Sequence, residues 1–275
     1  MCSCLFLSLI MTWLLAEETS VVTSSNEHNH ILFATRVDTA DDEGDTTCRN
    51  QLQLMNQKWE ALRKLYGSLY CNVHGIGPTG GFCLDANKAD IGDNAYLDVG
   101  LCAFVVSIVG QGASLGDFGA GVGQYRDCLT SNGTGVQWTG YDGAENVEEA
   151  TMNLVHFMDL SSKKWLGHQF DWILSLEVGE HIPHLLEDVF IGNLVRHAKK
   201  GIIMSWAVPG QGGHHHVNNR KNEYIVQKLG QQGFHLDHEV TSIGRSAVKI
   251  AWFKETLMVF RKEEEGAMTK GDRLL

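Results

Sequence analysis

Residues 115–125 read LGDFGAGVGQY, and this stretch constrains the fold more than any other part of the chain. Three glycines stand at every second position, Gly119, Gly121 and Gly123, and they follow a short apolar run that ends at Asp117. Glycine at this density in a strand-to-helix turn is typical of a backbone that lies against a nucleotide. The stretch therefore predicts a nucleotide-binding turn, and the identity of the nucleotide decides the chemistry.

The rest of the chain alternates short apolar runs with helical patterns. Strand-like runs occur at residues 113–117, 136–141, 154–158, 170–176, 201–207 and 256–261, and helical patterns occur at 52–69, 94–109, 184–199 and 222–232. Strands that are apolar throughout and separated by helices are typical of a parallel sheet covered on both faces. We therefore predict an α/β protein with a Rossmann-like, doubly wound sheet.

Asp117 helps to identify the ligand of the glycine turn. A dinucleotide fingerprint has the order G-x-G-x-x-G, whereas Gln124 takes the place of the third glycine here. A pyrophosphate favours positive potential at a helix N-terminus and no nearby carboxylate, while a ligand with an ammonium group favours the carboxylate. No Gly-Lys-Ser/Thr follows, which excludes a P-loop. The turn thus favours a nucleotide that carries a positive charge.

Four motifs in chain order resemble those of the class I S-adenosylmethionine-dependent methyltransferases. The glycine turn has their D-x-G-x-G-x-G form, WTGYD ends a second strand in Asp142, and FMDL places Asp159 after a third. The fourth motif, DWILSLEVGEHIP, begins with Asp171. The motifs follow one another at the spacing that α/β units require, and the resemblance covers about residues 113–261.

This resemblance implies a mostly parallel seven-stranded sheet with an antiparallel last strand, and S-adenosyl-L-methionine as the cofactor. Asp117 would hold the methionine end of the cofactor, Asp142 the ribose and Asp159 the adenine. Taken singly, Asp142 also fits a turn residue and Asp159 a helix cap. The full set of implied cofactor-binding residues is Asp117, Gly119, Ala120, Gly121, Gly123, Asp142, Gly143, Asp159, Leu160, Leu176 and Glu177.

The acceptor side of the site is predicted to contain four residues from two segments: Glu180, His181, His214 and His216. His181 also fits a helix cap or a core residue. If the HHH segment is extended, His214 and His216 point the same way. Three roles fit this loop. It could bind a metal ion, with Glu177 or Glu180 as a further ligand, or it could bind the substrate, with a neutral histidine as general base. It could also be a solvated loop in which Asn218 or Asn219 starts the next helix. The spacing lacks H-x-x-x-H or C-x-x-C, and we assign no metal ligand.

The predicted function is transfer of a methyl group by in-line displacement to nitrogen or oxygen of a small molecule, with a protein side chain as a further possible acceptor. No nucleic-acid partner is expected, because the formal net charge is −11. The resemblance points the same way, since family members that methylate base amines or amide side chains usually carry an Asn-Pro-Pro-Tyr type sequence, which this chain lacks. The alternatives are an aminopropyltransferase of the same fold and a ligand-binding relic without turnover. A nicotinamide oxidoreductase is disfavoured because Asp117 would lie beside a pyrophosphate.

The N-terminal part divides by composition. Residues 1–16 predict a signal peptide or short anchor, with no stable membrane span after processing, and therefore the secretory pathway, with a cytoplasmic or anchored protein as the alternative. A flexible acidic lead is expected at 17–48, a helical cap over the cofactor mouth at 49–112, the methyltransferase domain at 113–262 and a charged tail at 263–275. The sequence leaves the oligomeric state open.

Five cysteines follow residue 16, so at least one is expected to stay free or to pair between chains. Cys71 and Cys83 flank a glycine-rich turn and are placed to form a disulfide. Cys102 and Cys128 lie in apolar helical patterns and are expected to be core thiols. Asn132 begins an N-x-T glycosylation sequon, which agrees with secretion.

Overall fold

We analysed a computed structural model of the chain, in which residues 44–77, 83–84, 96–131 and 133–263 are described. The predicted signal segment 1–16, the lead up to residue 43, Asn132 and the tail from residue 264 lie outside the described residues. Within the described ranges, no helix combines the length and the apolar character that crossing a membrane would require.

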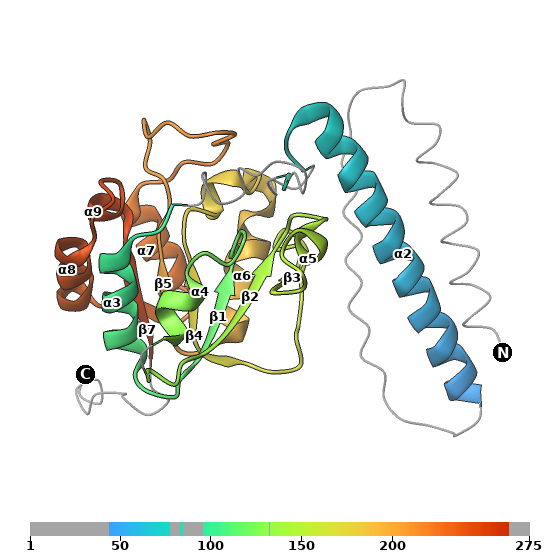
Figure 1. Ribbon diagram of the computed structural model, residues 1–275, viewed down its shortest axis with the longest axis horizontal. Helices are drawn as coiled ribbons and strands as arrows, with labels where there is room; N and C mark the ends of the chain where they lie inside the picture. Colours follow the sequence, from blue (N-terminus) through green and yellow to red (C-terminus); the bar gives the residue numbers. More distant parts are fainter. Residues whose placement is uncertain (1–43, 78–82, 85–95, 132, 264–275) are drawn as a thin grey trace, which may run out of the picture. The chain divides into compact units, whose positions relative to one another are not determined.

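A seven-stranded sheet forms the centre of the larger part of the chain, and the predicted fold class is confirmed (Figure 1). The strands lie in the order β3-β2-β1-β4-β5-β7-β6. β7 pairs antiparallel with both β5 and β6, and the other neighbouring strands pair in parallel. The strands are β1 (Ser114–Phe118), β2 (Gln137–Asp142), β3 (Val155–Phe157), β4 (Phe170–Ser175), β5 (Ala198–Met204), β6 (Phe234–Leu236) and β7 (Met258–Lys262).

Helices cover both faces of the sheet because successive strand residues point to opposite faces. In β5, Ile202 packs into one core cluster with Phe190 of α6 (Glu187–His197) and Ile225 of α7 (Asn222–Gly230). Ile203 packs into a second cluster with Leu101. That second layer contains α3 (Val99–Val109), α4 (Arg126–Thr130), α8 (His238–Ala247) and α9 (Phe253–Thr256). Both apolar faces of the parallel strands are thus buried, as the continuous apolar runs predict.

Several helix boundaries differ from the sequence prediction, and two cases have a clear structural reason. The helix expected at 184–199 is a 3₁₀ turn, η4 (His184–Leu186), followed by α6, and β5 already starts at Ala198. The helix expected from residue 94 begins at Val99 because Asp98 caps it, accepting a hydrogen bond from the Leu101 amide at 2.9 Å. Two short elements, α5 (Val147–Ala150) and η3 (Gly179–His181), complete this part of the chain.

Helix α2 (Gly44–His74) starts inside the segment expected to be the flexible lead. The chain separates into two compact units at residues 1–62 and 63–275, so α2 contributes to both. Its apolar stripe is exposed: Leu52, Trp59 and Leu62 are 51%, 46% and 50% exposed. Within this range, α3 packs into the second core cluster on the sheet. The helical cap expected at residues 49–112 stays a prediction.

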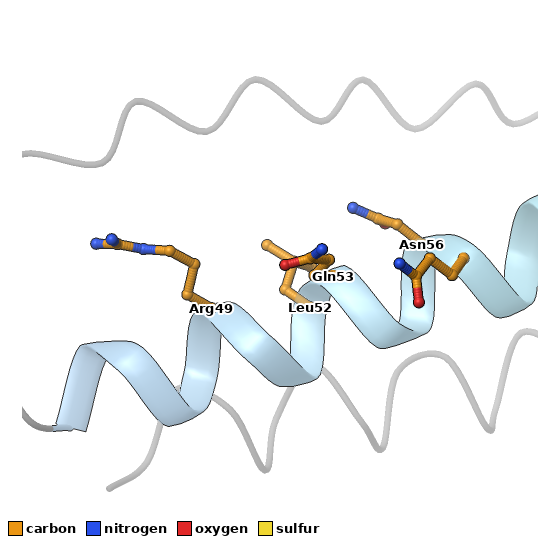
Figure 2. A pocket seen from close by; sticks show the side chains of 5 residues that line it. Arg49, Leu52, Gln53 and Asn56 are labelled. Atoms are coloured by element: carbon orange, nitrogen blue, oxygen red, sulfur yellow. The ribbon is translucent and has the colours of Figure 1, made fainter.

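One side of α2 borders a hollow, which Figure 2 shows from close by. Its described lining consists of Arg49, Leu52, Gln53, Asn56 and Gln57, all of them exposed. These side chains include no carboxylate, imidazole or thiol, so they offer no acid, base or nucleophile. The candidate site is therefore to be found in the sheet-containing unit.

The cysteines are paired more extensively than the sequence predicts. The Cys71–Cys83 disulfide is present as expected. Cys102 and Cys128, expected to be core thiols, instead form a second disulfide that joins α3 to α4. Cys48 is disulfide-bonded as well, so none of the five cysteines after residue 16 is a free thiol. The apolar pattern identified the two helices correctly, but only their packing side by side brings the Cα atoms of Cys102 and Cys128 to 5.9 Å.

Replacing Cys102 and Cys128 together by alanine should lower the free energy of unfolding by about 3 kcal/mol, because the disulfide closes a loop of 26 residues in the unfolded chain. Urea unfolding followed by circular dichroism measures the change. An unchanged midpoint and slope in the double variant would show that this bond does not stabilise the fold.

Candidate functional site

The strand order reverses direction between β1 and β4, which are neighbours although they are far apart in sequence. In open α/β sheets this reversal leaves a crevice at the carboxyl ends of the strands, where ligands bind. Asp117 lies near the end of β1, and Leu176 and Glu177 directly follow β4. Asp117, Leu176 and Glu177 therefore lie at the carboxyl ends of β1 and β4, where such a crevice is expected.

The glycine turn follows β1 and has the backbone that its composition predicts. Gly119, Gly121 and Gly123 have φ angles of 89°, 56° and 79°, a region that residues with side chains rarely adopt. A Cβ on Gly119 would lie 2.2 Å from a methyl group of Val178, so the turn also needs glycine for space. The amides of Gly119 and Ala120 donate to the Tyr141 carbonyl at 2.8 and 2.9 Å, which anchors the turn on β2.

Asp117 is buried at the base of this turn, with 3% of its surface exposed. The indole Nε1 of Trp138 donates to its Oδ2 at 3.0 Å. Burial raises the pKa of Asp117 to about 7, the Trp138 hydrogen bond lowers it in part, and the charge of Asp142 raises it further. Trp138 is the one hydrogen-bond donor to this carboxylate that the described residues supply, and a buried carboxylate with a single neutral donor is suited to bind a cation.

Asp142 ends β2 and joins two loops through its carboxylate. Its Oδ2 accepts from the Gly121 amide at 2.8 Å, and its Oδ1 accepts from the Ala144 amide at 2.9 Å. Burial raises the pKa of Asp142, and hydrogen bonds from the Ala144, Gly121 and Gly143 amides partly offset this. Each carboxylate oxygen has two lone pairs, so both can still accept a hydroxyl hydrogen. Asp142 and Gly143 are half-buried at this edge.

Asp159 follows β3 and is 2% exposed. Its Oδ1 accepts from the amide and hydroxyl of Ser161 at 2.9 and 2.5 Å, and its Oδ2 pairs with Arg63 of α2. Leu160 is buried in the core cluster beneath α6, and its carbonyl accepts from Asn193 at 3.0 Å. Asp159 therefore fixes the turn that follows β3, but no helix begins there, since the next element is β4, and the helix-cap alternative is not met. A role at the adenine stays a prediction.

The chain after β4 turns sharply at Glu177, which has a φ angle of 53° although it is not glycine. Its carboxylate accepts from Gln211 Nε2 at 2.9 Å and from Thr256 Oγ1 at 3.4 Å. Burial raises the pKa of Glu177, against the effect of its hydrogen bonds and of His216. Leu176 packs against the cluster that contains α3. Strained backbone of this kind is often found at functional sites, where the surrounding structure holds it.

Glu180 and His181 lie in the short η3 turn and are almost fully buried, 0% and 7% exposed. Within the part of the chain that the structure describes, neither carboxylate oxygen of Glu180 has a hydrogen bond of standard geometry. Burial raises the pKa of Glu180 well above its ordinary value, and the neighbouring charge of Glu177 adds to this effect. Burial lowers the pKa of His181 to about 4, helped by the charge of His216. His181 ends the η3 turn and does not cap a long helix, and its burial agrees with the alternative of a core residue.

The histidine loop brings only one of its two predicted residues to this cluster. The rings of His216 and His181 have their centroids 4.9 Å apart. His214 is exposed, because the backbone turns at His215 with a φ angle of 52° and the segment is not extended. The expectation that His214 and His216 point the same way was conditional on an extended segment, and that condition is not met.

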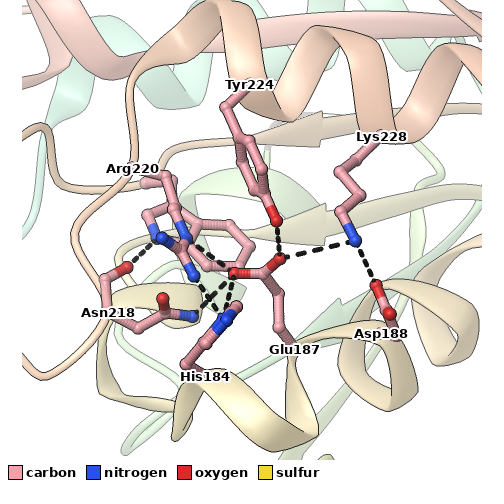
Figure 3. Close-up of polar contacts among 8 residues, drawn as sticks. His184, Glu187, Asp188, Asn218, Arg220, Tyr224 and Lys228 are labelled. Carbon is pink, nitrogen blue, oxygen red and sulfur yellow. Dashed lines mark hydrogen bonds and ion pairs between the residues drawn. The ribbon is translucent and has the colours of Figure 1, made fainter.

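The asparagines after the histidines do not start the next helix, which begins at Asn222. Asn218 Nδ2 instead donates to Glu187 Oε2 at 3.0 Å. The buried Glu187 also accepts from Arg220 at 2.8 Å and from Tyr224 at 2.5 Å, as Figure 3 shows. Burial raises the pKa of Glu187, but these hydrogen bonds outweigh it and hold the pKa below its ordinary value. This network fixes the loop that carries His216 to α6 and α7.

Sequence reasoning missed Trp138 and Tyr125 as parts of the site. A Cβ on Gly140 would lie 2.4 Å from the Trp138 indole, so a glycine within a strand makes room for the ring that reaches Asp117. Burial raises the pKa of Tyr125 to about 12, and Asp117 and Glu177 are among the charges that contribute. The signal available in the sequence was a glycine in the middle of β2, two residues after a tryptophan.

Comparison with known proteins finds similarity at the level of solved structures. No protein-family model matches the sequence, and no curated protein matches it. The magnesium protoporphyrin IX methyltransferase of Synechocystis with bound SAM is 20% identical, over 73% of this chain and 97% of that chain, with a TM-score of 0.48. A TehB-like SAM-dependent methyltransferase from Corynebacterium glutamicum is 16% identical, over 64% and 92%, with a TM-score of 0.45. The cyclase SpnF is 14% identical, over 74% and 96%, with a TM-score of 0.45.

The burial of Asp117 predicts a specific dependence of stability on pH. Its pKa is raised from 3.8 to about 7 on folding, so its contribution to stability is complete below pH about 4 and is lost as the pH rises through about 7. Asp117→Asn, which cannot ionise, should therefore gain stability relative to the wild type across this window, and the difference should become constant above it. Urea unfolding at several pH values measures both proteins.

Asp127→Asn is the matched control, because Asp127 is 88% exposed and lies on α4 outside the site. Its difference from the wild type should stay small at every pH. A difference between Asp117→Asn and the wild type that did not change with pH would contradict the raised pKa of Asp117.

Proposed function

We propose that this chain is an S-adenosylmethionine-dependent methyltransferase that acts on a small-molecule acceptor. The observation that carries the proposal is the Asp117 carboxylate, buried at the base of a glycine turn with one neutral hydrogen-bond donor. A buried carboxylate strengthens the binding of an ammonium group and weakens the binding of a diphosphate. S-adenosylmethionine combines an amino-acid ammonium group with a nucleoside, which suits this turn better than a dinucleotide does.

The other residues at the crevice have matching roles in this proposal. Asp142 has lone pairs left to accept the ribose hydroxyls, and Gly143 lets its loop approach the nucleoside. Asp159 acts by fixing the shape of the loop at the adenine end, since Ser161 and Arg63 engage its carboxylate. Leu160 and Leu176 provide apolar support from the two sides of the sheet.

The acceptor side consists of Glu180, His181 and His216. A Cβ on Gly119 would clash with Val178, which places the turn that leads to these residues against the glycine turn. The sulfonium of the cofactor supplies an activated methyl group. The protein then has to align the acceptor at near-attack distance and exclude water from it, and the burial of Glu180 and His181 is suited to that task.

The net charge and the disulfides bear on the partners and the compartment. A formal charge of −11 disfavours nucleic acid as the acceptor, and a small molecule or a protein side chain remains. Disulfides persist mainly in oxidising compartments, and both Cys71–Cys83 and Cys102–Cys128 are formed. We therefore place the protein in the secretory pathway as part of the proposal, in keeping with the apolar start of the chain.

Calorimetry with S-adenosylmethionine tests the cofactor. Asp117→Asn should weaken binding by about 10- to 100-fold, because a hydrogen bond between two charged groups is replaced by one to a neutral amide. Asp127→Asn should bind like the wild type. Affinity of the wild type should fall as the pH drops below about 7, where Asp117 takes up a proton, and Asp117→Asn should lack this dependence. Binding of NADH in place of S-adenosylmethionine would refute the assignment.

Methyl transfer itself is tested with isotope-labelled S-adenosylmethionine, incubated with the protein and extracts of small molecules and of proteins. We expect labelled small molecules that form with the wild type and not with Asp117→Asn at a limiting donor concentration. Mass spectrometry identifies the labelled products. Tight binding of the donor with no labelled product in either extract would favour a ligand-binding protein without turnover.

A further inference from the structure

We propose that Glu180, His181 and His216 bind one divalent transition-metal ion of the zinc type, at the acceptor side of the crevice. One ligand atom from each side chain lies within 4.8 Å of the others. The two imidazole rings meet edge to face, with centroids 4.9 Å apart and an angle of 81° between their planes. Two histidines and one glutamate form a ligand set of catalytic zinc sites.

The chemistry of these atoms supports a cation. Among the described residues, neither oxygen of Glu180 nor Nδ1 of His216 has a hydrogen bond of standard geometry, although the Glu180 and Ala207 amides and the Glu177 carboxyl lie near enough to affect the pKa of Glu180. Buried polar atoms are normally paired, so such a group of acceptors is costly unless something binds it. A divalent cation would accept electron pairs from all three residues at once. It would also compensate the charge of two neighbouring carboxylates, because Glu177 lies close enough to affect Glu180.

The ligands are held in place by the backbone around them. The Glu180 carbonyl accepts from the amides of Val217 and Asn218, both at 2.9 Å, which fixes the loop with His216 to the turn with Glu180. Trp206 Nε1 donates to the Asn218 carbonyl at 2.7 Å and holds the same loop from inside. A Cβ on Gly213 would lie 1.9 Å from His216 Nε2, so a glycine is needed where the ring packs.

The surrounding residues explain why the site has three ligands. Glu177 is occupied by Gln211 and Thr256, and His214 and His215 are exposed. Tetrahedral zinc with bonds of about 2.1 Å places its ligand atoms about 3.4 Å apart, so small side-chain rotations close the present cluster. Three protein ligands leave a coordination position open, as in catalytic zinc sites. This inference goes beyond the proposed methyl transfer and does not require it.

The test is the metal content of the full-length protein, purified without chelators or a histidine tag and measured by mass spectrometry after incubation with Zn²⁺ and removal of excess ion. About one Zn²⁺ per chain is expected for the wild type. His216→Ala and Glu180→Gln should lose most of it. His214→Ala is the matched control, an exposed histidine two residues away in the same loop, and should keep the metal of the wild type.

Two further measurements make each outcome decisive. Co²⁺ added to the metal-free wild type should give the visible absorption bands of a site with few ligands. This measurement needs no variant, so it is unaffected if a variant fails to fold. Calorimetry with S-adenosylmethionine on the wild type, with and without Zn²⁺, reports separately on the proposed function. If Glu180→Gln does not fold, the metal content of His216→Ala decides the test. His216 lies on a loop, so its replacement is expected to leave the fold intact.

A wild type that takes up neither Zn²⁺ nor Co²⁺ overturns the metal site even if it binds S-adenosylmethionine. An equal loss of metal in His214→Ala and His216→Ala also overturns it, because the metal would then be bound by the surface of the histidine loop.

Discussion

The burial of carboxylates at one edge of the sheet is the constraint on which the site depends. Asp117 and Glu180 are both buried away from water. Among the described residues, neither forms an ion pair or a hydrogen bond with a cationic side chain. Such groups cost free energy in the folded protein unless they stay protonated or meet a cation. The fold contains two such buried carboxylates, which agrees with the proposed binding of positively charged groups.

The edge is rigid because the end of each strand is bonded to its neighbour. Ser175 Oγ of β4 donates to the Phe118 carbonyl of β1 at 2.7 Å, and the turn after β1 donates to Tyr141 of β2. The Met158 amide after β3 donates to the Asp142 carbonyl at 2.8 Å. These bonds connect four parallel strands at their carboxyl ends. The glycine turn and the ends of β1 and β2, which carry Asp117 and Asp142, are thus held by hydrogen bonds between neighbouring strands.

Most of the fold was predictable from the sequence because it depends on local patterns. The apolar runs located β1 to β5 and β7, and the glycines located the turn after β1. Helix ends were less accurate, since a cap such as Asp98 acts through a single hydrogen bond. The disulfide between Cys102 and Cys128 could not be predicted, because the two helices meet only through the packing of the layer.

The sequence predicted the site residues that lie at the ends of strands. It did not predict those whose position depends on contacts between segments far apart in the chain. Asp117 and Asp142 are given by the rule that parallel strands end at one edge. The separation of His214 from His216 depends on one backbone angle at His215, which composition does not reveal. Trp138 of β2 donates a hydrogen bond to Asp117 of the neighbouring strand β1. This contact depends on the register of β1 against β2, which the sequence alone does not give.

The position of the Trp138 indole makes the residues at positions 138 and 140 of β2 dependent on each other. Gly140 has no side chain because the ring of Trp138 fills the space where its Cβ would stand, and Ala120 of the glycine turn lies 3.0 Å from the same point. Any larger residue at position 140 would push the ring away from Asp117 or push the turn outward. Among relatives of this chain, therefore, the aromatic residue and the glycine should be inherited or lost as a pair.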